Sequence, residues 1–331
     1  MPSICILGSV NADIVLHINK LPSLGETLDA ARPDTGFFVP GGKGANQAVA
    51  CAKLASHEMR AEMVCRFGND SHGEKLQSAL TSYGVGTSGS SRCADTPSGQ
   101  AYIFLHPGGN NSILLVGGAN REWPSVLSAE VRAMIEAASM VLLQREVPER
   151  VNVEAAVFAR SVGTPVMMDA GGMDEPIPDS LLAQLAYFCP NETELARITG
   201  MSVDGACDAE VLAAARELQR RGVANILVTL GTDGSLFVGA DGVVERAAAF
   251  RIAKADVVDT TGAGDCYRGA FAVALTSLDL SLAGALQFAA AASALCVQRL
   301  GAMPSMPARH EVIEFLAARG VVVSTAATSA L

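Results

Sequence analysis

The chain reads Asp259-Thr260-Thr261-Gly262-Ala263-Gly264-Asp265 immediately before an alanine-rich helical pattern. A glycine-rich turn that runs into a helix presents several unpaired backbone N–H groups at the positive end of the helix dipole. Such a site binds an anion without basic side chains, and glycine lets the backbone approach the anion closely. This stretch therefore predicts an anion-binding turn that opens a helix.

Asp265 ends this stretch, and its carboxylate distinguishes the site from an ordinary anion-binding turn. A carboxylate beside a bound phosphate repels it, so its presence needs a role, such as taking a proton from an attacking hydroxyl group. Aspartate is also a favoured N-cap residue, which would make Asp265 purely structural. The residues alone leave both interpretations open.

From residue 120 onward, short β-rich runs alternate with longer helical patterns. This alternation predicts an α/β fold with a doubly wound, mostly parallel central sheet flanked by helices on both faces. We expect strands at 140–143, 165–169, 187–189, 226–229 and 235–238. We expect helices at 148–161, 192–198, 209–221, 264–275 and 282–299.

The first third of the chain has a different pattern. A buried strand is expected at 4–7, whereas four runs look half-exposed, and the last two of them flank a turn sequence at 107–111. These runs are 14–18, 35–39, 101–105 and 112–116. Because ligands bind at the carboxyl ends of parallel strands, a small β-sheet there is suited to act as a lid. We expect one domain over 1–331, with a β-lid formed by interleaved segments of roughly 13–40 and 98–118.

The composition is that of a well-packed protein and argues against two classes of partner. Of the 331 residues, 50% are apolar and 18% are charged, which is enough apolar material for a sizeable core. The formal net charge is −10 and no basic stripe alternates with aromatic residues, so we expect no nucleic-acid partner. The longest apolar stretch, 283–297, is interrupted by Gln287 and Ser293 and is too short to span a bilayer, so we expect no membrane partner.

The cysteines and the two ends of the chain bear on its compartment. Eight cysteines are scattered without a C-x-x-C pair, which is typical of reduced, buried thiols in a cytosolic protein. The N-terminus has no cationic leader and runs straight into a strand, so we expect a cytoplasmic protein. The C-terminal Ser329-Ala330-Leu331 is close to the S-K-L peroxisomal signal but lacks its basic residue. We favour a frayed tail, with a peroxisome-like organelle as the lesser alternative.

Two more stretches extend the pattern toward the N-terminus. One follows the first strand as Gly8-Ser9-Val10-Asn11-Ala12-Asp13, and the other reads Gly41-Gly42-Lys43-Gly44-Ala45-Asn46-Gln47-Ala48. In this order and at these separations, the three stretches resemble the signatures of the ribokinase-like (PfkB) carbohydrate kinases, and the resemblance covers nearly the whole chain. The residues around Lys43 lack the spacing of a P-loop, which argues against Lys43 as a P-loop phosphate ligand. Gly8 is not followed by the G-x-G-x-x-G spacing, which argues against a Rossmann dehydrogenase.

The resemblance implies a catalytic and a sugar-binding role for several positions. Asp265 would be the base that deprotonates a sugar hydroxyl, and the backbone amides of Gly262, Ala263, Gly264 and Asp265 would stabilise charge on the transferred phosphoryl group. The sugar-binding positions of the family fall on Asn11, Asp13, Gly42, Lys43, Asn46, Glu146 and Asp265. For Asn11 and Asp13, ordinary turn chemistry after a strand is the alternative.

Two positions depart from the family pattern. Arg145 stands where a less charged residue is expected, and it either pairs with a surface acid or narrows the sugar pocket. The run Asp169-Ala170-Gly171-Gly172 stands where an Asn-Pro-rich turn is expected.

The resemblance also implies ATP, Mg²⁺ and K⁺ as cofactors. Asn191 and Glu194 would help to hold Mg²⁺ and the phosphates through water, and the same residues fit a capping box at a helix start. The remaining nucleotide positions fall on Thr229, Gly231, Gly234, Gly264 and Ala289, the last beside the adenine ring. A K⁺ site next to the anion-binding turn would involve Asp259, Thr261, Cys296, Gly301 and Ser305.

Within this family, the stretches at 8–13 and 41–48 together favour a kinase that phosphorylates D-ribose at O5 and releases ADP. Alternatives are a kinase of the same fold acting on fructose, a keto-deoxy sugar acid or a nucleoside such as adenosine. A nucleotide- or sugar-binding protein without catalysis is a hypothesis from another class, and the presence of Asp265 with every glycine of the turn argues against it. An exposed β-lid further suggests a homodimer formed through paired lids.

Overall fold

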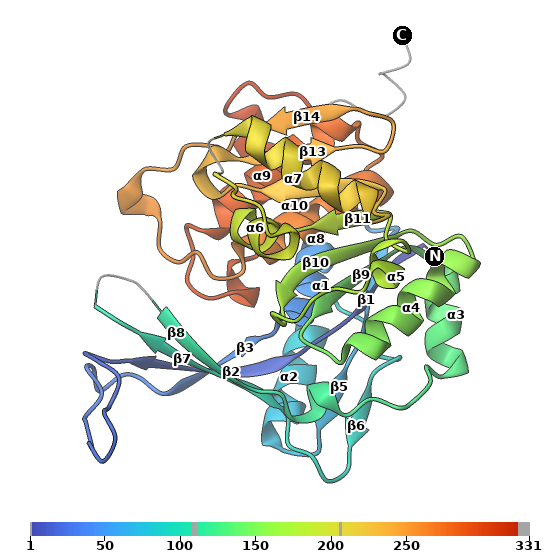
Figure 1. The fold of residues 1–331 in the computed structure, drawn as a ribbon. Coiled ribbons are helices and arrows are strands. Elements are labelled where there is room, and N and C mark those ends of the chain that lie inside the picture. Colours follow the sequence, from blue (N-terminus) through green and yellow to red (C-terminus); the bar gives the residue numbers. More distant parts are fainter. Residues whose placement is uncertain (1, 108–110, 205–206, 324–331) are drawn as a thin grey trace.

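The main body of the protein is built on an eight-stranded sheet with strand order β14-β13-β12-β11-β10-β9-β1-β4. A computed structural model describes residues 2–107, 111–204 and 207–323, and Figure 1 shows how its elements are arranged. The strands from β4 across to β12 are parallel, whereas β13 pairs antiparallel with both β12 and β14. They are β1 Ser3–Leu7, β4 Arg60–Val64, β9 Ala138–Arg145, β10 Val166–Gly172, β11 Tyr187–Cys189, β12 Asn225–Thr229, β13 Ser235–Val238 and β14 Val244–Ala247.

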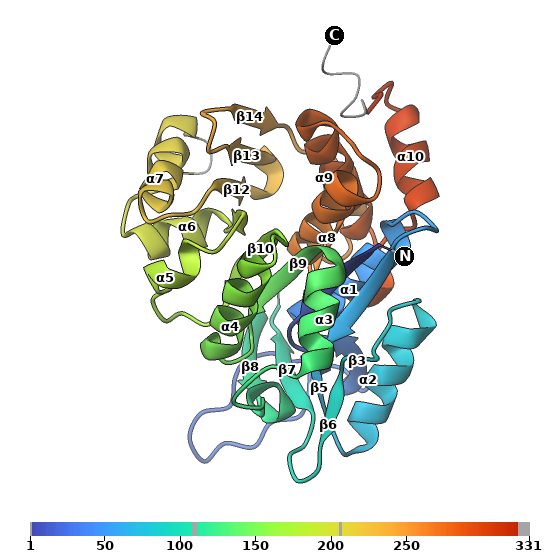
Figure 2. The ribbon, with the colours of Figure 1, turned by 90° about the vertical axis from the view of Figure 1, so that its right-hand side faces the viewer.

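Helices cover both faces of this sheet because its central strands are apolar on both sides (Figure 1, Figure 2). In β9, Met140 and Leu142 pack into one core, while Val141 and Leu143 pack into the other, as the two-residue period of a strand requires. The first core includes residues of α1 Lys43–Leu54, α2 Ser71–Ser82, α8 Ala263–Thr276, α9 Leu282–Cys296 and α10 Arg309–Ala317. The second includes residues of α3 Ala129–Ala137, α4 Glu149–Ser161, α5 Asp179–Leu182, α6 Glu192–Thr199 and α7 Asp208–Arg220.

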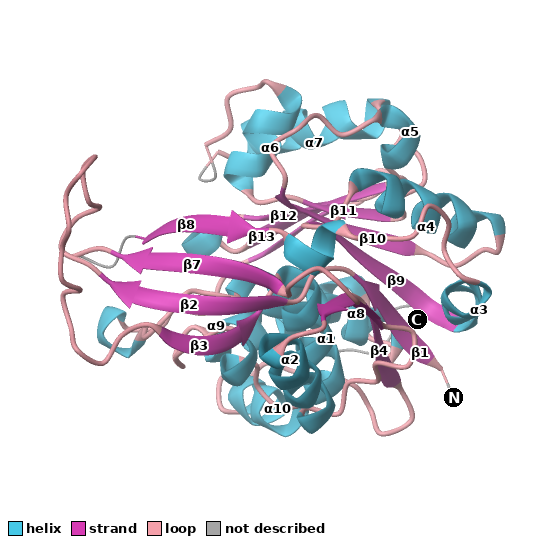
Figure 3. Cartoon of the chain, turned by 90° about the horizontal axis from the view of Figure 1, so that it is seen from below, coloured by secondary structure: helices cyan, strands magenta, loops and turns pink. Residues whose placement is uncertain are grey.

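A second sheet, of four strands in the order β3-β2-β7-β8, extends away from the main body (Figure 3). We call it the lid sheet; its strands are β2 Asn11–His17, β3 Phe37–Gly41, β7 Gly99–Leu105 and β8 Asn111–Val116. β2 pairs parallel with β7 and antiparallel with β3. Because β2 begins only four residues after β1 ends, the lid sheet leaves the main body beside the carboxyl end of β1. A separate two-stranded sheet pairs β5 Arg66–Gly68 with β6 Ser91–Cys93. In the sequence, these two strands come between β4 of the main sheet and β7 of the lid sheet.

The fold class expected from the sequence is confirmed, with differences at the ends of elements. The helix expected at 282–299 ends at Cys296, with Val297 as its C-cap. The strand expected at 14–18 already begins at Asn11, so Asn11 and Asp13 lie in a strand and the turn interpretation of these two residues is wrong. The middle of the turn expected at 107–111 and the tail residues 329–331 lie outside the described residues.

None of the helices in the described ranges is both long and apolar enough to cross a bilayer.

Candidate active site

The anion-binding turn lies at the start of α8. Gly262 is the N-cap with φ 78°, a left-handed conformation that favours glycine, and a Cβ added there would lie 3.0 Å from Cβ of Ala302. In the described part of the chain, the backbone N–H groups of Gly262, Gly264 and Asp265 have no acceptor, whereas that of Ala263 donates to the Thr260 carbonyl oxygen at 3.2 Å. Three N–H groups at the positive end of a 14-residue helix are therefore available to an anion.

Asp265 is a buried carboxylate held by two side-chain amides. Asn46 Nδ2 donates to its Oδ2 at 2.9 Å, and Gln47 Nε2 donates to its Oδ1 at 3.1 Å. The N-cap interpretation of Asp265 is wrong, because Gly262 is the N-cap and no side chain caps this helix. Burial raises the pKa of Asp265 to about 6; the positive charge of Lys43 lowers this pKa, and the negative charge of Asp169 raises it. A buried carboxyl group with a pKa near neutral pH is suited to act as a general base.

α1 brings its amides to Asp265 because it packs very closely against α8. A Cβ added to Gly269 would lie only 2.7 Å from Cβ of Ala50, so the absence of a side chain at 269 lets the two helices approach. Asn46 and Gln47 lie in the first turn of α1, and both are buried against Asp265. Gln144 Nε2, from the end of β9, donates to Oε1 of Gln47 at 2.9 Å and fixes the orientation of this amide.

A second buried carboxylate, Asp169 in the middle of β10, lies beside two cations. Lys43 Nζ is 3.5 Å from its Oδ2, and Arg268 Nη2 is 3.4 Å from its Oδ1. Gln47 Nε2 also donates to Oδ2 of Asp169 at 3.0 Å, so the same amide joins the two carboxylates. Burial alone would raise the pKa of Asp169, but Arg268 and Lys43 outweigh it and hold this pKa below its usual value. Asp169 is therefore ionised while Asp265 titrates near neutral pH.

The candidate sugar-binding residues lie where the lid sheet meets the main body. Glu146 Oε2 accepts hydrogen bonds from Ser9 Oγ at 2.6 Å and from the Lys43 backbone N–H at 3.1 Å. Asn11 Oδ1 accepts one from Asn120 Nδ2 at 2.7 Å. Gly42 is the N-cap of α1, with φ 94°.

Asp13 is buried without a full set of partners, as is Asn46, whose Oδ1 also has no hydrogen-bond partner in the described part of the chain. In Asp13 the atom without a partner there is Oδ1. Burial and the negative charges of Glu146 and Asp265 raise the pKa of Asp13 to about 8. Three carboxylates thus converge on this junction, and a ligand rich in hydroxyl donors would satisfy them.

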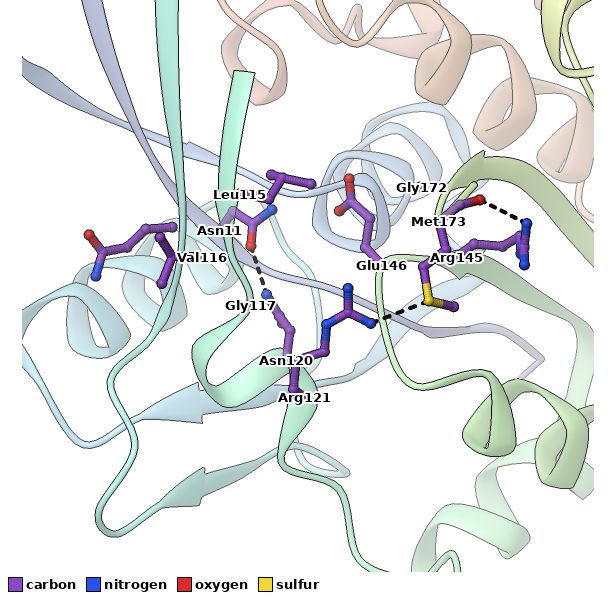
Figure 4. Close-up of a pocket in the computed structure, with 11 residues that line it drawn as sticks. Asn11, Leu115, Val116, Gly117, Asn120, Arg121, Arg145, Glu146, Gly172 and Met173 are labelled. Carbon is purple, nitrogen blue, oxygen red and sulfur yellow. Dashed lines mark hydrogen bonds between the residues drawn. The ribbon is translucent and has the colours of Figure 1, made fainter. Parts of the chain in front are cut away.

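A cavity of about 80 Å³ lies beside Asn11 and Glu146 (Figure 4). Leu115, Arg121 and Met173 line its other sides, so residues of the lid sheet and of the main body both face it. It extends the site on the side of the sugar-binding candidates, and Asp265 is not among its lining residues.

Arg145 resolves one of the two departures from the family pattern. Its side chain is fully buried and points away from the Glu146 carboxylate (Figure 4). It donates to the carbonyl oxygens of Met173 and Glu175, each at 2.8 Å, and to Glu149 Oε1 at 3.1 Å. Arg145 therefore pairs with an acid and also ties the chain after β10 to the wall of the cavity.

The candidate nucleotide residues follow the ends of β11 and β12. Asn191 and Glu194 form a capping box at the start of α6: Asn191 Oδ1 accepts from the Glu194 backbone N–H, and Glu194 Oε2 accepts from the Asn191 backbone N–H, both at 2.8 Å. Glu194 Oε1 makes no hydrogen bond to the described residues and faces Gly171. Thr229 pairs with Asn191 through an isolated bridge, and Gly231 and Gly234 both have positive φ in the turn that follows.

Ala289 is the exception among these candidates. Its side chain is fully buried in the core around α8 and α9, which leaves no exposed surface against which an adenine ring could stack. The small side chain at this position is explained by helix packing.

The five candidate K⁺ residues gather next to the anion-binding turn. Asp259 Oδ1 accepts from the Thr261 backbone N–H and Oδ2 from the Gly301 backbone N–H, both at 2.9 Å. Cys296 Sγ lies 3.0 Å from Ser305 Oγ, and both residues are buried. These contacts tie the loop before α8 to the segment after α9.

Three residues of this site were assigned no role from the sequence. Gln47 lies in the stretch 41–48, and Asp169 is the last residue of the strand expected at 165–169, so their positions in the sequence could have identified both as candidate site residues. Arg268 lies one helical turn after Gly264, and only its burial among Asp169, Cys189 and Glu194 shows that it belongs to the site.

Comparison with known proteins gives concordant matches over most of the chain. Residues 1–309 match the family described as pfkB family carbohydrate kinase. A ribokinase of Arabidopsis thaliana is 42% identical over 319 residues, which cover 95% of this chain and 81% of that protein. A deoxyribokinase of Salmonella typhi is 34% identical over 316 residues, which cover 95% of this chain and 98% of that protein.

Solved structures agree with these matches. The structure of Arabidopsis thaliana ribokinase complexed with ribose and ATP superposes with a TM-score of 0.88 at 41% identity, over 95% of this chain and 98% of that one. The ribokinase of Thermotoga maritima superposes with a TM-score of 0.82 at 34% identity, over 96% of this chain and 100% of that one.

Proposed function

This chain belongs to the pfkB family of carbohydrate kinases, and we propose that it transfers the γ-phosphoryl group of ATP to O5 of D-ribose. The products are D-ribose 5-phosphate and ADP. The observation that carries the proposal is the buried Asp265 carboxylate beside the free N–H groups of α8, in a chain 41% identical to a ribokinase whose structure contains ribose and ATP.

Asp265 is the general base in this reaction. It takes the proton of the O5 hydroxyl as O5 attacks the γ-phosphorus, and the bond from phosphorus to the oxygen bridging to ADP breaks. The N–H groups of Gly262, Ala263, Gly264 and Asp265 are the donors proposed for the charge on the transferred phosphoryl group. Among the described residues only that of Ala263 has another acceptor, the Thr260 carbonyl oxygen. Asn46 and Gln47 hold the carboxylate so that it faces the acceptor.

The ribose hydroxyls bind to Asn11, Asp13, Gly42, Lys43, Asn46 and Glu146. Asp13 supports this assignment because its buried Oδ1 lacks a partner, and leaving such an acceptor unpaired costs about 1–3 kcal/mol. A ribose hydroxyl that donates to Oδ1 removes this cost. A site built in this way rejects acceptors that lack the matching hydroxyl.

The nucleotide side of the site suits hydrated Mg²⁺. Asn191 and Glu194 leave one carboxylate oxygen, Oε1 of Glu194, free for a metal-bound water. In the described ranges no cluster of three or more His, Cys, Asp or Glu side chains could hold a metal by itself. Mg²⁺ bound to the phosphates of ATP would supply charge neutralisation there. The residues proposed to line the phosphates and ribose of the nucleotide are Thr229, Gly231, Gly234 and Gly264. The adenine contact implied for Ala289 is not supported, because this residue is fully buried.

The K⁺ assignment to Asp259, Thr261, Cys296, Gly301 and Ser305 fits the donor chemistry of the loop. Each carboxylate oxygen of Asp259 accepts one backbone N–H and retains a lone pair. A monovalent cation held there would steady the turn that carries the amides of Gly262 and Gly264. We also propose that the lid sheet closes over ribose, that two lid sheets pair in a homodimer, and that the enzyme acts in the cytoplasm.

The acceptor is tested by measuring ADP release with D-ribose, 2-deoxy-D-ribose, D-fructose and adenosine in parallel, with and without K⁺. The proposal predicts the highest kcat/KM with D-ribose and a rise on adding K⁺. A higher kcat/KM with 2-deoxy-D-ribose would instead place the chain with its deoxyribokinase relative. Turnover with fructose or adenosine alone would contradict the substrate, and no turnover with any acceptor would favour a binding protein.

A further inference from the structure

Arg268 is a buried arginine on α8 to which the family resemblance gives no role. It lies four residues after Gly264, so both residues occupy the same face of the helix. Side chains on a helix lean toward its N-terminus, and Nη1 of Arg268 lies 2.6 Å from the position that a Cβ on Gly264 would occupy. The guanidinium therefore covers Gly264, directly beside the free N–H groups of the anion-binding turn.

The other nitrogens of this guanidinium are fixed by the main body. Nε and Nη2 both donate to the carbonyl oxygen of Cys189, at 3.1 and 2.7 Å. Nη2 also lies 3.4 Å from Asp169 Oδ1 and 3.9 Å from Glu194 Oε2. Nη1 makes no hydrogen bond with any part of the chain that the structure describes. The edge with Nε and Nη2 is thus anchored, whereas Nη1 is unpaired in the described chain and lies beside Gly264 at the start of α8.

The charge of Arg268 is not needed for this anchoring. A neutral amide could donate to the Cys189 carbonyl without the cost of burying a cation. Asp169, which compensates part of the charge, is shared with Lys43. A preorganised donor fork with a free edge beside an anion-binding turn is suited to a phosphoryl group.

We propose that Arg268 is a further catalytic residue whose Nη1 donates to the γ-phosphoryl group of ATP as it passes to the acceptor. The proposal rests on the function proposed above, because it requires ATP as the phosphoryl donor. Charge on the three equatorial oxygens of the transferred group is met by Nη1 and by the N–H groups of Gly264 and Asp265. The O5 proton still goes to Asp265, and Arg268 keeps its own protons throughout.

The test compares Arg268→Gln and Arg268→Lys with wild type and with Arg145→Gln as a matched control. Arg145 is also fully buried and also donates to backbone carbonyls, but it lies on the sugar side. Calorimetry gives the dissociation constants of Mg-ADP and of the non-hydrolysable β,γ-imido analogue of Mg-ATP, so the contribution of the γ-phosphoryl group is read without turnover.

In Arg268→Gln we expect the imido analogue to bind at least about tenfold more weakly, with ADP binding changed less than about threefold. We expect kcat to fall roughly 10²- to 10³-fold, as on removal of one transition-state donor. Arg268→Lys keeps the charge without the fork and should show a smaller loss of the same kind. Arg145→Gln should leave the ratio of the two nucleotide affinities at its wild-type value.

The proposal is overturned if Arg268→Gln lowers both affinities equally, or leaves their ratio and kcat within about threefold of wild type. If Arg268→Gln shows no cooperative melting, the same criteria apply to Arg268→Lys. Wild-type protein that binds both nucleotides but phosphorylates no sugar would contradict the proposed function instead, while the affinity ratio would still decide the role of Arg268.

Discussion

Asp265 and Asp13 are both buried carboxylates of one site, but their surroundings give them different protonation near neutral pH. Asp265 accepts two amide hydrogen bonds and lies near Lys43, so burial raises its pKa only to about 6. For Asp13, burial and the charges of Glu146 and Asp265 all act in one direction and raise its pKa to about 8. At pH 7 Asp265 is therefore mostly ionised, whereas Asp13 mostly carries a proton until a ligand binds.

The pH dependence of turnover follows from the state of Asp265. Because only the ionised carboxylate can accept the O5 proton, kcat/KM for ribose, which reports the groups of the enzyme before ribose binds, should rise with pH through about 6. Gln47→Leu removes one donor that stabilises the ionised form, so the rise should shift to higher pH. The pH profile of kcat/KM for ribose checks this, and a profile that is flat between pH 5 and 8 would contradict the assignment.

Asp13 links the site to stability. Its pKa is raised from 3.8 to about 8 in the folded protein, so the folded state holds the proton more tightly than the unfolded state. Asp13 therefore makes folding less favourable as pH rises from about 4 to about 8. Asp13→Asn removes this penalty, so its melting temperature relative to wild type should increase between pH 5 and pH 8, while its KM for ribose rises.

Asp95→Asn is the matched control for this measurement, because Asp95 is exposed and makes no ion pair with the described residues. Its melting temperature relative to wild type should not change with pH. A pH-independent difference for Asp13→Asn would show that Asp13 is ionised over this whole range.

At the level of elements, the contact of α1 with α8 brings the amides to the base. The two helices meet at Gly269 and Ala50, where there is no room for a further methyl group. The chain thus uses a glycine in the middle of a helix, at a cost of about 1 kcal/mol in helix propensity, to gain this close approach.

Gly269→Ala tests the contact. The added methyl group gains about 1 kcal/mol in helix propensity, but overpacking against Ala50 costs about 1–3 kcal/mol, and the amides of α1 move away from Asp265. We expect a lower melting temperature and a several-fold lower kcat. Ala50→Gly in the same protein should restore kcat by making room, and no restoration would show that the helix contact does not control the base.

Strands and helices could largely be predicted from the sequence, because their patterns are local. The short apolar runs at 140–143 and 226–229 and the glycine turn before α8 required no tertiary information. The parallel pairing of β2 with β7 could not be predicted, since it joins segments more than 80 residues apart. Nor could the role of Arg268, whose partners come from the middle of β10, the end of β11 and the start of α6.

In a single copy of the chain, strand β8 of the lid sheet exposes apolar side chains to solvent. Among the described residues, the outer strands β3 and β8 of this sheet each have a neighbouring strand on one side only, and the apolar residue Leu114 of β8 is 59% exposed. Leu115 and Val116 of the same strand line the cavity beside Asn11. Pairing of two lid sheets would cover exposed apolar surface and hold this wall of the sugar site in place.

Leu114→Asp tests the pairing, because an aspartate at an apolar interface is costly to bury. We expect light scattering to show a dimer for wild type and a monomer for the variant, with a raised KM for ribose and little change in KM for ATP. Val157→Asp, on the exposed face of α4, is the matched control and should remain dimeric. A monomeric wild-type protein at micromolar concentration would contradict the dimer.

Asp265 as the base of an ATP-dependent ribose kinase is tested by the product that wild type and Asp265→Asn form. The ribose 5-phosphate formed from D-ribose and ATP is quantified by mass spectrometry for wild type and for Asp265→Asn, with ribose and nucleotide affinities measured on the same samples. We predict ribose 5-phosphate from wild type, and a kcat lower by roughly 10²- to 10⁴-fold in the variant with both affinities retained within about tenfold. Asp265→Asn protein that binds both substrates and forms ribose 5-phosphate at the wild-type rate would show that Asp265 is not the base.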